Sequence, residues 1–132
     1  MQNPKEIYTV KMTETFDKSA ERLLTKKKFT KLPEQIEKVI QELRSGDFEG
    51  NILKKNINPA YTVYKKRLPN LDTKAGKSNG YRLIYIVMHD FNVVGLLEIY
   101  YKKETETLSD AYIEGLIDWF ILELEDSEQS YQ

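Results

Sequence analysis

Apolar side chains recur at intervals of three and four residues in three separate segments of the chain, which predicts three amphipathic helices. The first segment runs from about residue 15 into the late twenties, and the second begins with Pro33 and ends before Gly46. Pro is favoured at the first position of a helix and Gly just after its end. The third segment follows Ser109, a favourable N-cap residue, and continues to Leu124.

Four other segments have the composition of β-strands, because they are rich in Val, Ile, Leu, Tyr and Thr. A short strand is predicted at residues 6–12, and longer strands at 61–68, 81–88 and 93–101. The last two are close together along the chain, which predicts a hairpin. Residues 47–60 are polar and contain Gly, Asn and Pro, so they are predicted to be mostly loop.

The predicted order is strand, helix, helix, three strands and helix, which is typical of an α+β domain with a small, mostly antiparallel sheet. We expect the two N-terminal helices to pack on one face of that sheet and the other face to be exposed. A chain of 132 residues has room for one domain. That domain is predicted to span residues 1–125, followed by an acidic, frayed tail at 126–132.

The composition excludes several kinds of chemistry. The chain has no Cys and one His. This argues against disulfide scaffolds, thiolate zinc sites, thiol nucleophiles, multi-histidine metal sites and Ser-His triads. We therefore expect no metal and no cofactor. The sequence has no apolar run long enough to span a bilayer and no signal peptide at its start, so a cytoplasmic protein that does not associate with membranes is predicted.

The net charge of −1 hides a strong asymmetry along the chain. Residues 1–103 carry a net charge of +8, and residues 104–132 are purely acidic with −9. Residues 54–82 alone carry +7. Such a segment suits a polyanionic partner such as RNA. A solvated basic face balanced by an acidic tail is an equally good interpretation of composition alone.

Basic side chains gather on one predicted strand and on the turn that follows it. In a strand, Lys65 and Arg67 project from the same face, where two neighbouring cations form a phosphate clamp. The alternative is an edge strand protected by its charges against aggregation. The next segment is a Gly-rich turn with many backbone donors, and it is flanked by Lys74, Lys77 and Arg82.

The segment at residues 98–104 places aromatic side chains beside cations. Tyr101 and Lys103 share one face of the strand, and Tyr100 and Lys102 share the other. An aromatic ring next to a cation suits base stacking together with a phosphate contact. The sequence does not determine which of the two faces meets a ligand.

Two single residues admit a functional and an ordinary interpretation. His89 is predicted to be a surface residue of a turn, with a catalytic base as the alternative. Trp119 lies on the third predicted helix, which is apolar on nearly all sides. A helix of this kind suggests that a partner covers part of it.

Three sequence blocks, at residues 64–70, 76–85 and 96–104, together resemble the RelE/HigB branch of the RelE/ParE superfamily of bacterial toxins. The middle block, GKSNGYRLIY, is the most specific of the three. Its Asn79 replaces a residue that is usually Gly in the family, and Asn tolerates the same left-handed backbone angles. The predicted order of helices and strands is also that of the RelE-like fold.

The resemblance implies the toxin component of a type II toxin–antitoxin system, acting as a ribosome-dependent mRNA endonuclease that inhibits translation. Cleavage would proceed through the RNA 2′-hydroxyl without a metal. The implied partners are the ribosome with its mRNA and a cognate antitoxin, a helix-turn-helix protein encoded by an adjacent gene. Operator DNA would be bound only through that antitoxin.

The same resemblance implies roles for individual residues. Arg82 matches the arginine that binds the scissile phosphate, and Lys65 and Arg67 match paired cations, one of them a possible base. Lys103 matches a second phosphate-binding position, and Tyr101 is a candidate for stacking or proton transfer. The basic residues expected to bind RNA around this centre are Lys54, Lys55, Lys66, Lys74, Lys77 and Lys102.

Two departures from the family keep other functions open. The tyrosine that the family has further along the chain falls here near Leu108 and Ser109, so the general acid is unassigned. The chain is also not basic overall, unlike most of the family. A gyrase-inhibiting toxin of the ParE branch and a catalytically inactive module that binds an antitoxin are therefore the alternatives.

Overall fold

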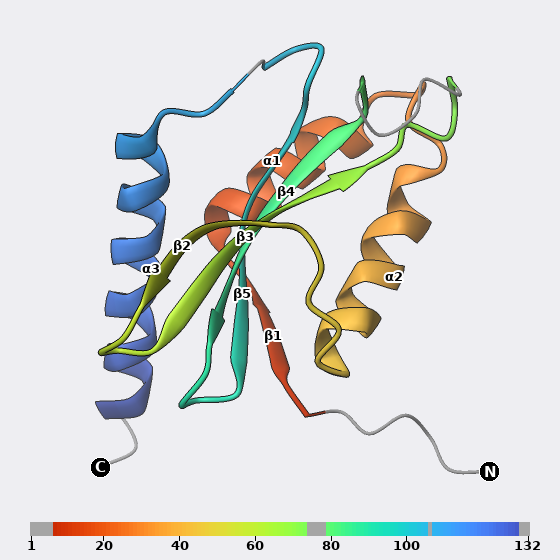
Figure 1. Cartoon of the computed structure of the whole chain (residues 1–132). Helices are drawn as coiled ribbons and strands as arrows, with labels where there is room; N and C mark the ends of the chain where they lie inside the picture. Colours follow the sequence, from red (N-terminus) through yellow and green to blue (C-terminus); the bar gives the residue numbers. More distant parts are fainter. Residues whose placement is uncertain (1–6, 74–78, 106, 130–132) are drawn as a thin grey trace, which may run out of the picture.

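The computed structural model of the chain describes residues 7–73, 79–105 and 107–129 and forms an α+β fold, as predicted (Figure 1). Its five strands form one sheet in the order β1-β5-β4-β3-β2. Only β1 and β5 are parallel, and the other neighbours are antiparallel. The elements in chain order are β1 (Thr9–Met12), α1 (Glu14–Leu24), α2 (Leu32–Arg44), β2 (Asn51–Asn56), β3 (Tyr61–Leu68), β4 (Tyr81–Met88), β5 (Val93–Tyr101) and α3 (Asp110–Gln129).

The prediction of loop at residues 47–60 is wrong in part, because Asn51–Asn56 forms the edge strand β2. This strand pairs antiparallel with β3, and the register shifts between Ile52 and Lys54. Asn and Lys have low strand propensity, but an edge strand exposes most of its side chains to water and tolerates them. Backbone pairing with β3 therefore overrides the local preference.

The helices α1 and α2 pack on one face of the sheet, as expected. Phe16, Leu23 and Leu43 of these helices join the large cluster of buried side chains on that face. The Oγ1 of Thr13 accepts a hydrogen bond from the backbone N–H of Phe16 at 3.1 Å and so caps α1. At the end of α2, Gly46 takes a φ of +85°, a conformation that Gly adopts readily.

The opposite face of the sheet is covered by α3, which corrects the expectation that this face is exposed. Ile117, Phe120 and Leu124 of α3 pack against apolar side chains of β3, β4 and β5. Figure 1 shows α3 and α2 on opposite sides of the sheet. The two layers explain why every residue of β4 is buried. The helix continues to Gln129, beyond the end that the sequence predicts.

The start of α3 agrees with the prediction. The hydroxyl oxygen of Ser109 accepts a hydrogen bond from the backbone N–H of Tyr112 at 3.1 Å, as an N-cap residue does. Among the described residues, no helix combines the length and the apolar character needed to cross a membrane.

Candidate functional site

Two arginines lie opposite each other on the sheet face that α3 covers. Arg67 of β3 is the direct cross-strand partner of Arg82 of β4. Arg82 in turn pairs with Tyr100 of β5, so the three residues form one row across the sheet. Side chains directly opposite each other in antiparallel strands project from the same face. The pairing of their strands therefore places Arg67 and Arg82 side by side on one face of the sheet.

A second row of residues lies next to the first on the same face. Lys65 of β3 pairs with Ile84 of β4, and Ile84 pairs with Glu98 of β5. Asn51 of β2 extends this row to the edge of the sheet. Three cationic side chains, those of Lys65, Arg67 and Arg82, thus come from two neighbouring strands and share one face.

Arg82 is buried, with 3% of its surface exposed. Its Nη1 donates a hydrogen bond to the carbonyl oxygen of Tyr81 at 3.1 Å, which helps to orient the guanidinium. Burial, and then the charge of Arg67, lower the pKa of Arg82 from its ordinary value, because both disfavour the charged form. An anion bound to the pair stabilises both charges, so this position is suited to a phosphate.

A polar groove with a volume of about 310 Å³ opens beside the basic half of β3. It exists because β2 begins at Asn51, opposite Lys65, so the end of β3 extends past its neighbour. At Gly50 the chain comes so close to β3 that a Cβ atom would lie 2.7 Å from the carbonyl oxygen of Lys65. The groove is lined by Glu49, Gly50, Asn51, Lys65, Lys66 and Arg67.

The structure does not bring Tyr101 to this face. The ring of Tyr101 packs edge-on against Phe29 at 4.9 Å between centroids, within the cluster beneath α1 and α2. Its hydroxyl accepts a hydrogen bond from Nδ2 of Asn70 at 3.2 Å. Because consecutive residues of a strand face opposite sides, the tyrosine beside Arg82 is Tyr100.

Two of the lysines expected to bind RNA are held in ion pairs. Nζ of Lys54 lies 2.7 Å from Oε1 of Glu114 on α3, and this hydrogen bond is the main reason why the pKa of Lys54 is raised. Nζ of Lys66 lies 2.7 Å from Oε2 of Glu49. Lys66 also faces the side of the sheet opposite to Lys65. Both lysines border the candidate site and contribute less free charge than the sequence suggests.

The other predicted cations lie around the site or outside the described residues. Lys55 is exposed on the edge strand β2. Lys102 and Lys103 lie in the turn after β5, where the backbone N–H of Lys102 donates to the carbonyl oxygen of Gly80 at 3.0 Å. Lys74 and Lys77 fall in the segment 74–78, outside the described residues.

The single histidine is at the other end of β4 from Arg82. His89 follows directly after Met88, the last residue of this strand. Its Nε2 is 2.9 Å from Oγ1 of Thr62, and the residue is exposed. This placement agrees with the interpretation of His89 as a residue of a surface turn.

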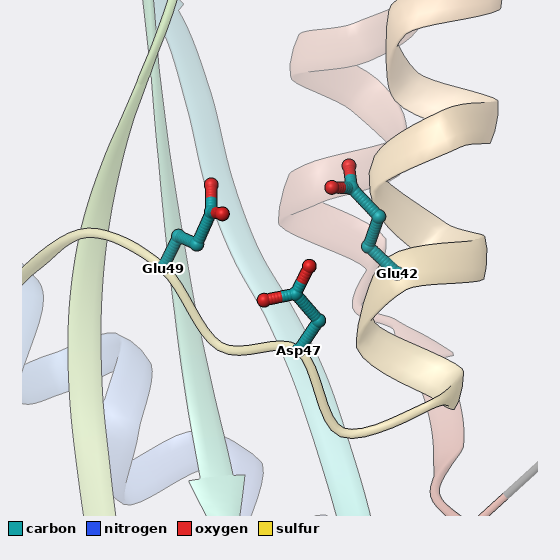
Figure 2. A group of neighbouring side chains, drawn as sticks. All are labelled: Glu42, Asp47 and Glu49. Atoms are coloured by element: carbon teal, nitrogen blue, oxygen red, sulfur yellow. The ribbon is translucent and has the colours of Figure 1, made fainter.

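Three carboxylates gather on the α2 side of the basic strand. Figure 2 shows Glu42, Asp47 and Glu49 facing one another around the turn that follows α2. Their carboxylate oxygens approach within 4.8 Å, and two of the three residues are exposed. Glu49 also accepts the hydrogen bond from Lys66. The cluster places negative charge beside Lys66, on the opposite face from the arginine pair.

Sequence reasoning did not single out Glu98 and Tyr112, which lie on the same side of the sheet as the arginine row. Glu98 is buried on the face of Arg82, with 5% of its surface exposed. Its Oε2 accepts a hydrogen bond from the hydroxyl of Tyr112 at 2.6 Å. One signal was present in the sequence, because Glu98 is the only charged residue in the apolar strand VVGLLEIYY. A charged side chain in such a strand is rarely buried without a partner.

No protein-family model matches the chain, and no curated protein matches it. Among solved structures, the chain is similar to two of the E. coli toxin RelE. The first is a double arginine-to-alanine mutant in the free state, with 21% identity, a TM-score of 0.44 and coverage of 76% of this chain and 88% of that one. The second is the isolated toxin, with 21% identity, a TM-score of 0.45 and coverage of 84% and 97%.

Proposed function

We propose that the chain is the toxin component of a type II toxin–antitoxin system and cleaves mRNA on the ribosome, as its resemblance to the RelE/HigB branch implies. The observation that supports this function best is the pairing of Arg67 with Arg82, next to Lys65, on one face of the sheet. Three cations at neighbouring positions suit the phosphodiester of an RNA chain. The groove beside β3 is lined by Lys65 and Arg67, so it offers an RNA backbone access to these two cations.

The proposed reaction uses the RNA as its own nucleophile. The 2′-oxygen attacks the adjacent phosphorus, the bond from phosphorus to the 5′-oxygen breaks, and the products are a 2′,3′-cyclic phosphate and a 5′-hydroxyl. Arg82 and Arg67 stabilise the negative charge that develops on the phosphorane, since positioned cations act most strongly where charge forms. Lys65 lies one row away and supplies a proton to the departing 5′-oxygen.

The remaining cations assist in binding. Lys102 and Lys103 are proposed to contact phosphates that flank the scissile position, because they lie in the turn after β5, beside the arginine row. Such contacts position the RNA without reading its bases. Lys55 is not part of this proposal, since it pairs with Thr62 and therefore faces the side of the sheet opposite to Lys65. Tyr101 is not part of this proposal, since it packs on the opposite face of the sheet.

We propose that a cognate antitoxin is the protein partner and that it covers the outer side of α3. Trp119 and Leu122 of this helix are 60% and 55% exposed. Large apolar side chains exposed together are typical of interaction surfaces. The helix has no basic residue in its last turn and is acidic along its length, so a basic segment of the partner is expected there.

The test is cleavage mapping by primer extension on a defined message bound to programmed ribosomes. The wild-type protein is compared with Arg82→Gln and with Lys18→Gln, a control at an exposed position of α1. We expect wild type and Lys18→Gln to cut at the same positions. Arg82→Gln should cut at least about 100-fold more slowly, because it lacks a positioned charge at the phosphate.

Two controls accompany the cleavage assay. Circular dichroism establishes that all three proteins are folded, and free RNA without ribosomes tests the requirement for the ribosome. A message left intact by a folded wild-type protein rejects the proposed function. In that case, inhibition of DNA supercoiling by gyrase is the next activity to measure. Equal rates for wild type and Arg82→Gln reject the role of the arginine pair.

A further inference from the structure

The groove beside β3 contains neutral hydrogen-bonding groups that the reaction as proposed does not use. It has a volume of about 310 Å³, more than a single nucleobase occupies, and Arg67 of the arginine row lines it. Its cations suit phosphates, but its lining also includes Gly50 and Asn51. Contacts to phosphate position a nucleic acid, and contacts to base edges read its sequence. The neutral groups of the groove are therefore candidates for a contact with a base.

The backbone of Arg67 points towards this groove. The carbonyl oxygen of Lys65 faces the β2 side, since a Cβ atom at Gly50 would lie 2.7 Å from it. Ala60 faces the β4 side, because its carbonyl oxygen accepts a hydrogen bond from the backbone N–H of His89 at 3.1 Å. The direction of the backbone groups alternates along an antiparallel strand, so Arg67 faces the same side as Lys65. Because β2 begins opposite Lys65, it provides no strand partner for the N–H and C=O of Arg67.

Asn51 places an amide beside these backbone groups. It is the cross-strand partner of Lys65, so its side chain shares one face of the sheet with Lys65 and Arg67. Arg67 is two residues further along β3, which makes Asn51 and Arg67 diagonal neighbours, about 7–8 Å apart. The side chain of Asn51 is exposed, while pairing with β3 fixes its backbone. Its amide can both donate and accept hydrogen bonds at the groove.

Adenine has hydrogen-bonding edges that match both groups. Its N6 amino group and its N1 offer a donor and an acceptor to the C=O and N–H of Arg67. On its other edge, N6 and N7 offer a donor and an acceptor to the amide of an Asn side chain, which is the usual pairing of Asn with this base. Guanine presents two acceptors on that edge, and pyrimidines have no N7. Adenine is therefore the base that satisfies Arg67 and Asn51 together.

From this arrangement we infer that the groove beside β3 binds an adenine base next to the scissile phosphate, and that Asn51 determines this specificity. The inference deepens the proposed function and rests on it. The base belongs to a nucleotide beside the cut, because Arg67 is common to the groove and to the arginine pair. A peptide strand could also pair with the backbone of Arg67. RNA is favoured because the side chains that line the groove have a net positive charge, even with Lys66 paired to Glu49.

The experiment maps cleavage on programmed ribosomes that carry a pool of messages with random bases around the cut. Sequencing of the product ends gives the relative rate for each base at each position. Wild type is compared with Asn51→Ala, which removes the amide and keeps the backbone of β2. Asn58→Ala is the matched control, because Asn58 is an exposed asparagine in the turn between β2 and β3. Circular dichroism establishes that the proteins are folded.

We expect wild type to favour adenine about 5- to 100-fold at one position next to the cut, which is the discrimination of one bidentate base contact. Asn51→Ala should lose most of this preference, because its rate on messages with adenine falls towards its rate on the others. Its rate on messages without adenine at that position should stay close to that of wild type. Asn58→Ala should keep the wild-type preference.

Three results overturn the inference and leave the proposed nuclease function standing. The first is a wild type without a preference for adenine beside the cut, and the second is a preference that Asn51→Ala retains. After either of these, a peptide strand paired with Arg67 becomes the better account of the groove. The third is an Asn51→Ala protein that is equally slow on every message, which would give Asn51 a structural role. If folded wild type does not cleave at all, the proposed function fails, and the inference fails with it.

Discussion

Arg67 of β3 and Arg82 of β4 are direct cross-strand partners, so two positively charged side chains lie side by side on one face of the sheet. Like charges placed directly opposite each other destabilise a strand pair. The buried Arg82 has a lowered pKa as a result of burial and of this neighbour. If the pair binds a phosphate, as proposed, the fold gives up some stability for activity, which is a common relationship between the two.

The first prediction concerns this relationship. Arg67→Gln removes the repulsion and should raise the free energy of unfolding in urea by about 0.2–1 kcal/mol. The same change should reduce the rate of RNA cleavage at least tenfold, because one charge at the phosphate is lost. Lys18→Gln, which changes the same charge on the exposed side of α1, should leave the cleavage rate unaffected. A variant that is both less stable and fully active contradicts the argument.

The second prediction separates two lysines of neighbouring strands, Lys54 of β2 and Lys65 of β3. Lys54→Gln breaks the ion pair with Glu114 and should lower the free energy of unfolding by at most about 1 kcal/mol, the usual range for a partly exposed pair. Its cleavage rate should be close to that of wild type. Lys65→Gln should have the opposite profile, with unchanged stability and slow cleavage.

Urea denaturation and single-turnover cleavage of both proteins test that prediction. Salt dependence adds an independent measure, because loss of a phosphate contact reduces the slope of log affinity against log salt by about 1. This reduction is expected for Lys65→Gln and not for Lys54→Gln. If the slope is reduced in Lys54→Gln and unchanged in Lys65→Gln, the RNA binds near β2 and α3 and not at the arginine row.

The third prediction concerns the turn that leads into Arg82. A Cβ atom at Gly80 would lie 1.9 Å from the carbonyl oxygen of Leu68 and 2.9 Å from the backbone nitrogen of Asn70. Gly80→Ala must therefore push the start of β4 away from the end of β3. We expect it to lower stability by about 1–3 kcal/mol, as overpacking does. The cleavage rate should also fall, because Arg82 and Arg67 are moved apart.

Gly115→Ala is the matched control for this substitution. A Cβ atom at Gly115 meets nothing within 4 Å, and the residue lies within α3. Since Ala is favoured over Gly in a helix, the variant should be more stable by about 0.5–1 kcal/mol. Thermal unfolding of the two variants is the measurement, and equal effects of the same sign would contradict the described packing.

The fourth prediction is a pH dependence of stability. Glu104, which follows β5, accepts hydrogen bonds from Lys26 and from Arg22 of α1. The hydrogen bond from Lys26 is the main reason why the pKa of Glu104 is lowered. A carboxyl group with a lowered pKa in the folded state adds stability above its unfolded pKa, and this stability is lost as the pH falls through the folded value.

Glu104→Gln should therefore be less stable than wild type at pH 7, by at most about 1 kcal/mol. The difference should shrink as the pH falls below about 4.5 and disappear once Glu104 is protonated in both states. Urea denaturation at a series of pH values from 7 to 2.5 gives the comparison. A difference that stays constant over this range would show that the two ion pairs do not stabilise the fold.

Periodicity and residue type determined a large part of this fold before any contact was known. The strands at 61–68, 81–88 and 93–101 have the predicted bounds, because their runs of Val, Ile, Leu and Tyr dominate local preference. The alternation within a strand also placed Lys65 and Arg67 on one face. These properties depend on neighbouring residues of one segment, so the sequence of that segment is sufficient to predict them.

The tertiary structure decided what depends on residues far apart in the chain. The polar segment Asn51–Asn56 became a strand only because the edge of β3 offered it backbone partners. The choice of Tyr100 over Tyr101 beside Arg82 followed from the face that α3 covers. Glu98 met Tyr112 because a helix crosses the sheet at that point. Pairing between separate elements is set by packing of the whole chain, and local sequence preference contains no information about it.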